Sequence, residues 1–169
     1  MALMDLKLAD SSATETLGLA LARSFPGAVL GPAVLHLRGE LAAGKTTCVR
    51  ALLRSLGVTG LVRSPTYTLV ETYALNGLTC VHIDLYRLQA AIEVDALGLR
   101  DYLGPGCLLL IEWPEKGAQA LPAADMDLFL RYAGQGRSAQ VSAETTLGAE
   151  WLDNLGRDSS LAPYVTNLT

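Results

Sequence analysis

The stretch Gly39-Glu40-Leu41-Ala42-Ala43-Gly44-Lys45-Thr46, the glycine loop (39–46), decides the fold because it matches the pattern G-x-x-x-x-G-K-[ST]. An apolar run of strand length, 33–37, precedes the loop, and 47–56 follows it with apolar residues at helical spacing. A glycine-rich loop between a strand and a helix presents backbone N–H groups to phosphate oxygens. By average composition the pattern would occur by chance in about one chain of this length in a hundred. The sequence therefore predicts a P-loop.

Side chains at the end of the glycine loop are predicted to contact phosphates and a metal ion. Lys45 is expected to reach the β- and γ-phosphates of a nucleotide. The hydroxyl of Thr46 is expected to bind magnesium, a hard cation that prefers oxygen ligands, and Thr47 adds an α-phosphate contact. Guanine specificity usually accompanies Asn-Lys-x-Asp, which this sequence lacks. We therefore expect ATP or ADP with Mg²⁺, held by residues 39–47.

A P-loop site also requires a carboxylate at the end of another strand, which holds magnesium or its water ligands. Glu112 directly follows the apolar run 107–111, and Asp84 ends the run 81–84. Many strand-terminal acids only cap the following turn, but opposite a P-loop both acids are candidate ligands. The predicted catalytic residues are Lys45, Asp84 and Glu112, and the predicted metal ligands are Thr46, Glu112 and Asp84.

Three further features near these motifs each have a functional and a structural interpretation. The loop Ser64-Pro65-Thr66 is either a switch that orders on the γ-phosphate, through the hydroxyl of Ser64 or Thr66, or an ordinary turn before a strand. Trp113, directly after Glu112, either stacks on a ligand or partner or packs in the interior. His82 lies within a strand and is expected to be structural rather than functional.

The remaining sequence predicts one α/β domain, specifically a P-loop NTPase-like three-layer domain with a mixed central sheet. We assign residues 1–155 to this domain and expect 156–169 to be a weakly ordered C-terminal tail. Asn76-Gly77 and Gly134-Gln135-Gly136 are hairpin signals. The other predicted elements are a helix at 13–23 capped by Ser11 or Ser12, hairpins 67–73/79–85 and 126–132/138–143, and helices at 90–103 and 147–155.

Composition excludes several classes of protein. The net charge is −4, and the 13 basic residues are scattered, so the chain itself shows no basic face for nucleic acid. No uncharged run reaches the about 20 residues of a membrane helix, and acidic residues interrupt the N-terminus where a signal peptide would be apolar. The three cysteines lie in apolar stretches and are expected to be buried, reduced thiols. We expect a soluble cytoplasmic protein.

Taken together, the motifs resemble the TsaE (YjeE) family of bacterial ATPases, which are needed to make threonylcarbamoyladenosine in tRNA. The resemblance covers about residues 10–145 and rests on GELAAGKTT (39–47), SPTYTLVETY (64–73), HIDLYRL (82–88), LGLRDYL (97–103) and LIEWPEKG (110–117). It implies a single P-loop domain that works with two partners, TsaB and TsaD. TsaD carries the transfer chemistry, and TsaE binds the pair and uses ATP to support turnover. Contact with tRNA would then be indirect, through the partners, and no membrane is involved.

The resemblance also implies roles for particular residues. The family's phosphate loop falls on 39–47, its magnesium ligands on Thr46 and Glu112, its HxDxYR aspartate on Asp84, and its switch on Ser64 to Thr66. The pair Gly136-Arg137 resembles a family feature near the C-terminus, and the stretch Ser11 to Thr14 is expected to contact the adenine. The family usually reads Gly-Ala-Gly-Lys where this chain reads Ala42-Ala43-Gly44-Lys45. An alanine is disfavoured at position 42 only if that position requires a positive φ.

Three functions are compatible with these features: an ATPase that drives or resets a partner complex, a small-molecule kinase, and a nucleotide-dependent binding module without hydrolysis. The small size and the absence of an acceptor domain favour the ATPase. A kinase usually carries several lid arginines, whereas the arginines beyond residue 90 do not cluster in the sequence. Accumulation of ADP and phosphate with the partners would exclude the binding module.

Overall fold

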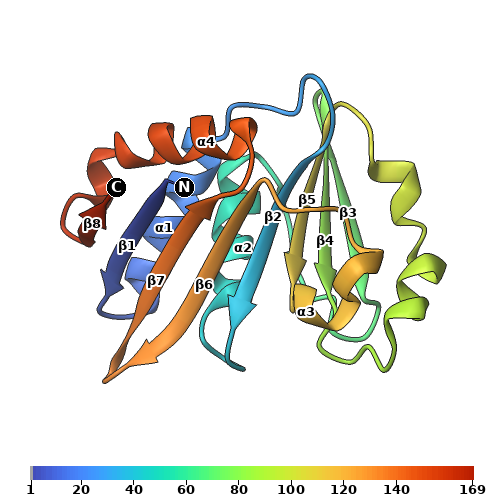
Figure 1. Cartoon of the computed structure of the whole chain (residues 1–169), viewed down its shortest axis with the longest axis horizontal. Helices are drawn as coiled ribbons and strands as arrows, with labels where there is room; N and C mark the ends of the chain where they lie inside the picture. The colour runs from blue at the N-terminus through green and yellow to red at the C-terminus, as the bar shows by residue number, and fades with distance from the viewer. Residues whose placement is uncertain (1) are drawn as a thin grey trace.

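The computed structural model describes residues 2–169 and is built around an eight-stranded β-sheet with the order β3-β4-β5-β2-β6-β7-β1-β8 (Figure 1). Strands β4, β5, β2 and β6 are parallel, and the remaining strands join this unit antiparallel. The chain is therefore a single α/β domain with a mixed sheet, as predicted. The strands are β1 (Leu3–Leu8), β2 (Ala33–Gly39), β3 (Val70–Leu75), β4 (Leu78–Asp84), β5 (Cys107–Glu112), β6 (Met126–Ala133), β7 (Gly136–Ala143) and β8 (Val165–Leu168).

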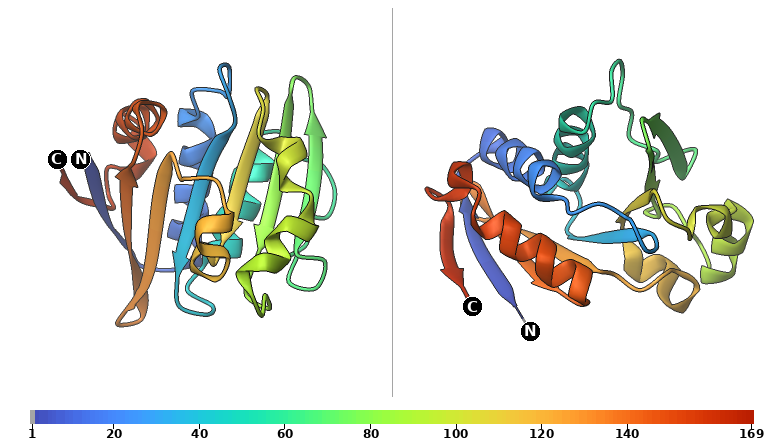
Figure 2. Two further views of the ribbon diagram at one scale, coloured as in Figure 1. Left: turned by 45° about the vertical axis from the view of Figure 1, so that its right-hand side comes forward. Right: turned by 90° about the horizontal axis from the view of Figure 1, so that it is seen from above.

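Helices cover the sheet unequally (Figure 2). Helices α1 (Ser11–Ser24) and α2 (Lys45–Ser55) pack together on one face. Helix α4 (Thr146–Gly156) contacts β6, β7 and α1, and its Trp151 donates to the Leu21 carbonyl. The opposite face is covered beside β4 and β5 by α3 (Pro114–Gly117) and the 3-10 helices η1 (Ala91–Leu97), η2 (Leu99–Tyr102) and η3 (Ala118–Ala120). A further 3-10 helix, η4 (Ser159–Leu161), precedes β8.

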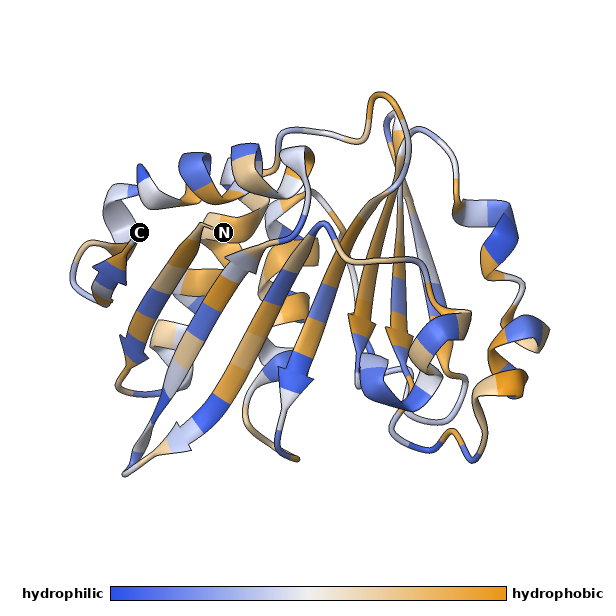
Figure 3. Cartoon of the chain, in the orientation of Figure 1, coloured by the Kyte–Doolittle hydropathy of each residue, from blue (hydrophilic) through white to orange (hydrophobic). Residues whose placement is uncertain are grey.

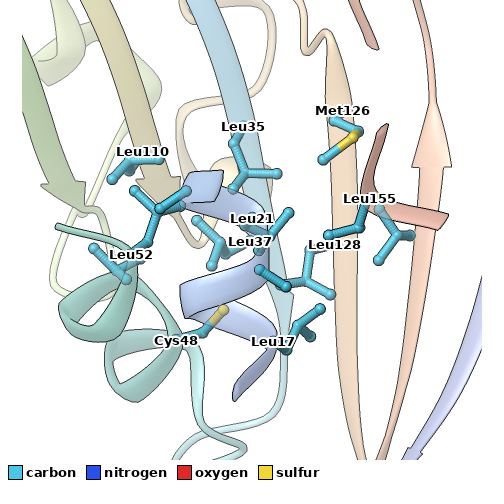
Figure 4. Packing of buried hydrophobic residues seen from close by; sticks show 14 of the residues in the cluster. Leu17, Leu21, Leu35, Leu37, Cys48, Leu52, Leu110, Met126, Leu128 and Leu155 are labelled. Atoms are coloured by element: carbon cyan, nitrogen blue, oxygen red, sulfur yellow. The ribbon is translucent and has the colours of Figure 1, made fainter. Parts of the chain in front are cut away.

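Side-chain alternation along the strands explains these layers. On β5, Leu108 and Leu110 join the larger core against α1 and α2, whereas Leu109 and Ile111 join a smaller core under the short helices. Both faces of β5 are buried, as its continuous apolar sequence predicts. The larger core also contains Leu35 and other side chains labelled in Figure 4. Polar and apolar residues alternate on β6 and β7, because the face of these strands that points away from α1 is less covered by helices (Figure 3).

Most of the predicted elements are present. The two hairpins form as β3–β4 and β6–β7, with Asn76-Gly77 between the first pair and Gly134-Gln135 between the second. One prediction about helices is wrong: 90–103 is not one helix but two 3-10 helices, separated by Gly98 at φ 71°. The cap of α1 is Asp10 rather than Ser11 or Ser12: the Asp10 carboxylate accepts the Ala13 N–H at 2.9 Å.

Both ends of the chain contribute to the sheet. No strand was predicted at the N-terminus, yet β1 pairs with β7 and its Met4, Leu6 and Leu8 are buried. Where a weakly ordered tail was predicted, η4 and β8 form, and β8 pairs with β1. Arg23 of α1 holds Asp158 in this segment at 2.9 Å. The period-two apolar pattern at Met4, Leu6 and Leu8 was the available signal for β1.

Two smaller predictions have mixed outcomes. Cys48 and Cys80 are buried, but Cys107 is partly exposed rather than buried. Burial raises the pKa of the Cys48 thiol to about 12, so this thiol stays protonated. Within residues 2–169, every helix is too short or too polar to cross a membrane.

Candidate functional site

The predicted site residues lie at the carboxyl edge of the parallel strands. Asp84 ends β4 and Glu112 ends β5, and the two are paired in the sheet register. Leu37 of β2 pairs with Glu112, so the chain enters the glycine loop beside Glu112 and one strand away from Asp84. Ligands of open α/β sheets bind at this edge, where loops leave the strands. The topology therefore brings together segments that are distant in the sequence.

The glycine loop has a backbone that depends on glycine at two positions. At Gly39, with φ 130°, an added Cβ would lie 2.0 Å from the Leu130 carbonyl oxygen of β6. Gly44, with φ 109°, immediately precedes Lys45 at the start of α2. The loop thus turns sharply and points the first free N–H groups of α2 toward the strand ends. Ala42 also has a positive φ of 60°, which alanine adopts at an energetic cost.

Lys45 is folded back over the glycine loop. Its ammonium donates to the carbonyl oxygens of Gly39 and Glu40, at 2.6 and 2.7 Å, and lies 4.0 Å from the ring centroid of Trp113. Burial lowers the pKa of Lys45 below its ordinary value, and the negative charge of Glu112 opposes this shift. A lysine in this position would attract an anionic ligand, and the attraction strengthens when the ligand displaces water from the cleft.

Glu112 is hydrogen-bonded from two sides. The Thr46 hydroxyl lies 2.9 Å from each carboxylate oxygen, and His82 Nε2 lies 2.7 Å from Oε1. His82 is fully buried and Glu112 is 2% exposed. His82 was predicted to be structural, and its contact with Glu112 was not predicted. The signal was the period of two along β4, which places His82 on the same face as Asp84.

Asp84 interacts with the segment that was predicted to be a switch. The hydroxyls of Ser64 and Thr66 lie 2.7 Å apart, and each lies near Asp84 Oδ2, at 3.5 and 3.3 Å. The Tyr86 N–H donates to Oδ1 at 3.0 Å. Burial raises the pKa of Asp84, the Tyr86 hydrogen bond opposes the shift, and the charge of Glu112 adds to it. Tyr86 was not predicted, and its ring lies 5.1 Å from that of Trp113.

These side chains surround a cleft of about 410 Å³, the first cleft. A second cleft of about 360 Å³ lies on the other side of the glycine loop, and the two share Ala42, Gly44 and Thr47. The first cleft is lined by Leu41, Ala42, Gly44, Lys45, Thr46, Thr47, Ser64, Thr66, Asp84, Tyr86, Glu112 and Trp113. The second is lined by Ala9, Asp10, Ser11, Thr14, Ala42, Ala43, Gly44, Thr47, Gln135 and Arg137.

The predicted site residues divide between the two clefts. Lys45, Thr46, Asp84 and Glu112 line the first cleft with Ser64 and Thr66, whereas Ser11, Ala43 and Arg137 line the second. Gly39 and Glu40 line neither cleft, and their carbonyls accept the Lys45 ammonium instead. Trp113 lines the first cleft and is partly buried, and it also packs against the smaller core, so both interpretations of this residue stay open.

The oxygen atoms at the first cleft suit magnesium that arrives with phosphate. Within residues 2–169 no three His, Cys, Asp or Glu side chains form a metal cage. Magnesium, however, commonly takes one or two protein oxygens and completes its shell with water and phosphate. The Thr46 hydroxyl and the Glu112 carboxylate supply two such oxygen groups side by side, hydrogen-bonded to each other at 2.9 Å.

Comparison with known proteins gives a consistent result. The family described as "Threonylcarbamoyl adenosine biosynthesis protein TsaE" matches residues 8–140, which include every predicted site residue. A relative from Haemophilus influenzae, named "tRNA threonylcarbamoyladenosine biosynthesis protein TsaE", is 44% identical over 115 residues, 68% of this chain and 73% of that protein. A Nostoc relative of the same name is 35% identical over 141 residues, 80% of this chain and 83% of that protein. The crystal structure of YdiB from Bacillus subtilis superposes with a TM-score of 0.75 at 26% identity, covering 93% and 97% of the two chains.

Proposed function

Because the chain belongs to the TsaE family, we propose that it is a P-loop ATPase with an NTPase-like fold that supports threonylcarbamoyladenosine modification of tRNA. The observation that carries this proposal is the approach of Thr46, the residue after the loop lysine, to the strand-terminal carboxylate Glu112 at 2.9 Å. A loop, lysine, hydroxyl and carboxylate in this arrangement are the parts that bind and cleave a nucleoside triphosphate.

Each part of the first cleft has a role in this proposal. The N–H groups at the start of α2 and the Lys45 ammonium bind the β- and γ-phosphates. Thr46 and Glu112 would hold magnesium, with Asp84 reaching it directly or through water; when bound, the ion neutralises charge on the phosphate oxygens. Glu112 also orients the attacking water. Lys45 exchanges its bonds to the Gly39 and Glu40 carbonyls for bonds to phosphate.

The second cleft is suited to the nucleoside. It shares Gly44 and Thr47 with the phosphate side, so one ligand can cross the glycine loop from one cleft to the other. Ser11 and Asp10 offer polar groups at the start of α1, and Arg137 of β7 also lines this cleft. We assign the adenosine to this cleft and expect ADP to bind more tightly than GDP.

The partners are proposed to be a TsaB–TsaD-like pair, which would contact tRNA in place of this chain. Leu41 and Tyr86 line the first cleft with exposed apolar surface, and exposed Tyr67 follows the Ser64–Thr66 segment. Apolar side chains at the mouth of a site favour coverage by a protein partner. With a net charge of −4, the chain alone would release few counterions from RNA, so indirect contact with tRNA is consistent.

Steady-state phosphate release, with and without a purified TsaB–TsaD pair, tests the proposal. For the chain alone we expect hydrolysis well below about 10 per second, because a partner is needed to order the Ser64–Thr66 segment and to cover the open cleft. Hydrolysis should be faster with the pair. Calorimetry should show ADP binding with magnesium. Tighter binding of GDP than ADP, or ADP formation only with a small-molecule acceptor, would contradict the proposal.

A further inference from the structure

The tip of the β6–β7 hairpin lies beside the glycine loop and carries a pair of facing side chains. Tyr132 of β6 and Arg137 of β7 are direct cross-strand neighbours. The Arg137 guanidinium lies 4.2 Å from the centroid of the Tyr132 ring, within the range of a cation–π contact. Because β6 also pairs with β2 as far as Gly39, the hairpin is fixed next to the point where the glycine loop begins.

This pair donates to three consecutive carbonyls of the glycine loop. The Tyr132 hydroxyl donates to the Leu41 carbonyl at 2.9 Å. Arg137 donates from Nε to the Ala43 carbonyl at 3.2 Å and from Nη2 to the Ala42 carbonyl at 3.4 Å. A peptide whose carbonyl is held on one side directs the next N–H to the other side. The contacts therefore fix the orientation of the loop amides.

The held segment includes the strained residue of the loop. Ala42 has φ 60°, a conformation in which the Cβ of an L-residue crowds its own backbone. Glycine takes this conformation at little cost, whereas alanine tends to leave it unless neighbouring contacts hold it. The Tyr132 and Arg137 contacts lie on the residues at and on either side of Ala42.

We propose that Tyr132 and Arg137 form a clamp that holds the strained glycine loop in its phosphate-binding shape. They are positioning residues, and the inference deepens the proposed function and rests on it. Tyr132 lines neither cleft, and its hydroxyl contacts the Leu41 carbonyl, so the effect of this hydroxyl on a nucleotide passes through the loop backbone. Arg137 lines the second cleft, so a change there would mix two effects. Tyr132 is therefore the residue that tests the clamp.

The first measurement is ADP affinity with magnesium, by calorimetry, for Tyr132→Phe alone and together with Ala42→Gly. Phenylalanine keeps the ring over which Arg137 lies and removes only the hydroxyl. We expect Tyr132→Phe to weaken ADP binding about three- to tenfold, which corresponds to one hydrogen bond. Tyr102→Phe, a hydroxyl removal on η2, should leave affinity unchanged. In the Ala42→Gly background the loop reaches the same shape without strain, so Tyr132→Phe should then change affinity by less than about twofold.

The second measurement needs no nucleotide and separates this inference from the proposed function. Backbone coupling constants of Ala42, measured by NMR on the nucleotide-free protein, report its φ. We expect a positive φ in the parent protein and in Tyr102→Phe, and a shift toward negative φ in Tyr132→Phe. An Ala42 φ that does not respond to Tyr132→Phe would overturn the clamp, as would unchanged ADP affinity or an equal loss in the parent and Ala42→Gly backgrounds. If the parent fails to bind ADP, the proposed function fails, and the NMR result still decides the clamp.

Discussion

The Thr46 hydroxyl lies 2.9 Å from both carboxylate oxygens of Glu112, although 66 positions separate the two residues in the sequence. The contact joins the first turn of α2 to the end of β5 and closes the floor of the first cleft. Glu112 is almost completely buried, so its carboxylate oxygens depend on hydrogen bonds from protein groups. Thr46 and His82 supply those partners from two different elements.

Ala42→Gly should stabilise the protein. Ala42 is held at φ 60°, which costs alanine about 1–2 kcal/mol, and glycine removes this cost but adds flexibility to the unfolded chain. We expect the free energy of unfolding to rise by about 0.5–1 kcal/mol, measured by urea denaturation. Ala43→Gly is the matched control: its fully buried methyl group would be lost without relief of strain, so stability should fall by about 1 kcal/mol. Equal losses for both variants would contradict strain at Ala42.

His82→Leu should reduce hydrolysis more than nucleotide binding. Leucine removes the partner at 2.7 Å from the Glu112 carboxylate, which then loses a hydrogen bond and part of its fixed orientation. We expect the turnover number to fall about tenfold with ADP affinity within about twofold, and the free energy of unfolding to fall by about 1–3 kcal/mol. His82→Gln retains a side-chain donor and should recover part of the turnover. Parent turnover in a folded His82→Leu protein would show that the contact is only structural.

Asp158→Asn should destabilise the protein in a pH-dependent manner. The Arg23 guanidinium beside Asp158 lowers the pKa of that carboxyl to about 2. Since the folded pKa lies below the unfolded value, the ionised carboxylate stabilises the fold above about pH 4, and this stabilisation is lost as the pH falls toward 2. Because Arg23 is half exposed, we expect only about 0.5–1 kcal/mol at pH 7.

Thermal unfolding of the parent and Asp158→Asn from pH 7 to pH 3 measures this difference, which should narrow toward acid. Asp153→Asn is the matched control, because it breaks an exposed ion pair with Arg157 in the same part of the chain. It should lower the free energy of unfolding by less than about 0.5 kcal/mol. A difference that stays constant with pH would exclude the ion pair as its cause. A loss no larger than that of the control would mean that Arg23 does not hold the C-terminal segment.

Local patterns predicted several elements whose signal lay within one segment, although the period-two pattern of β1 was missed. The glycine loop, the buried run at β5 and the turn residues Asn76-Gly77 each depend on nearby residues, and the structure has the expected element at each. The helix predicted at 90–103 failed because Gly98 interrupts it with a positive φ. The last strand, β8, lacked a local signal, because it forms by pairing with β1 across the whole length of the chain.

The candidate site was predictable in its residues but not in its contacts. Glu112 and Asp84 could be found because each ends an apolar run, and the parallel topology brings them to one edge. The contact of His82 with Glu112 depends on the register between β4 and β5. Tyr132 carried no sequence signal, because its hydroxyl reaches Leu41 only after β6 has paired with β2. Such contacts follow from tertiary structure alone.

Glu112→Gln should separate nucleotide binding from hydrolysis. Glutamine keeps the size of the side chain and removes its charge, so it would hold magnesium and orient water poorly. Nucleotide should still bind, because the loop amides and Lys45 supply most of the phosphate contacts. Loss of one electrostatic element of a transition state lowers hydrolysis by about a hundredfold or more. Phosphate release with the partner pair and ADP calorimetry measure the two effects.

Glu115→Gln is the control for this change, because it alters the same kind of side chain three residues later. Glu115 lies on α3, where it approaches Arg38 at 3.9 Å and lines neither cleft. Its substitution should change hydrolysis less than about twofold, since exposed ion pairs contribute little. The Glu112→Gln protein should remain folded, because His82 Nε2 can donate a hydrogen bond to the amide oxygen of the new glutamine side chain. Circular dichroism and thermal unfolding check this point. A folded Glu112→Gln protein that hydrolyses ATP at the parent rate with the partners present would remove Glu112 from the catalytic site, and the buried contact with Thr46 would then be structural.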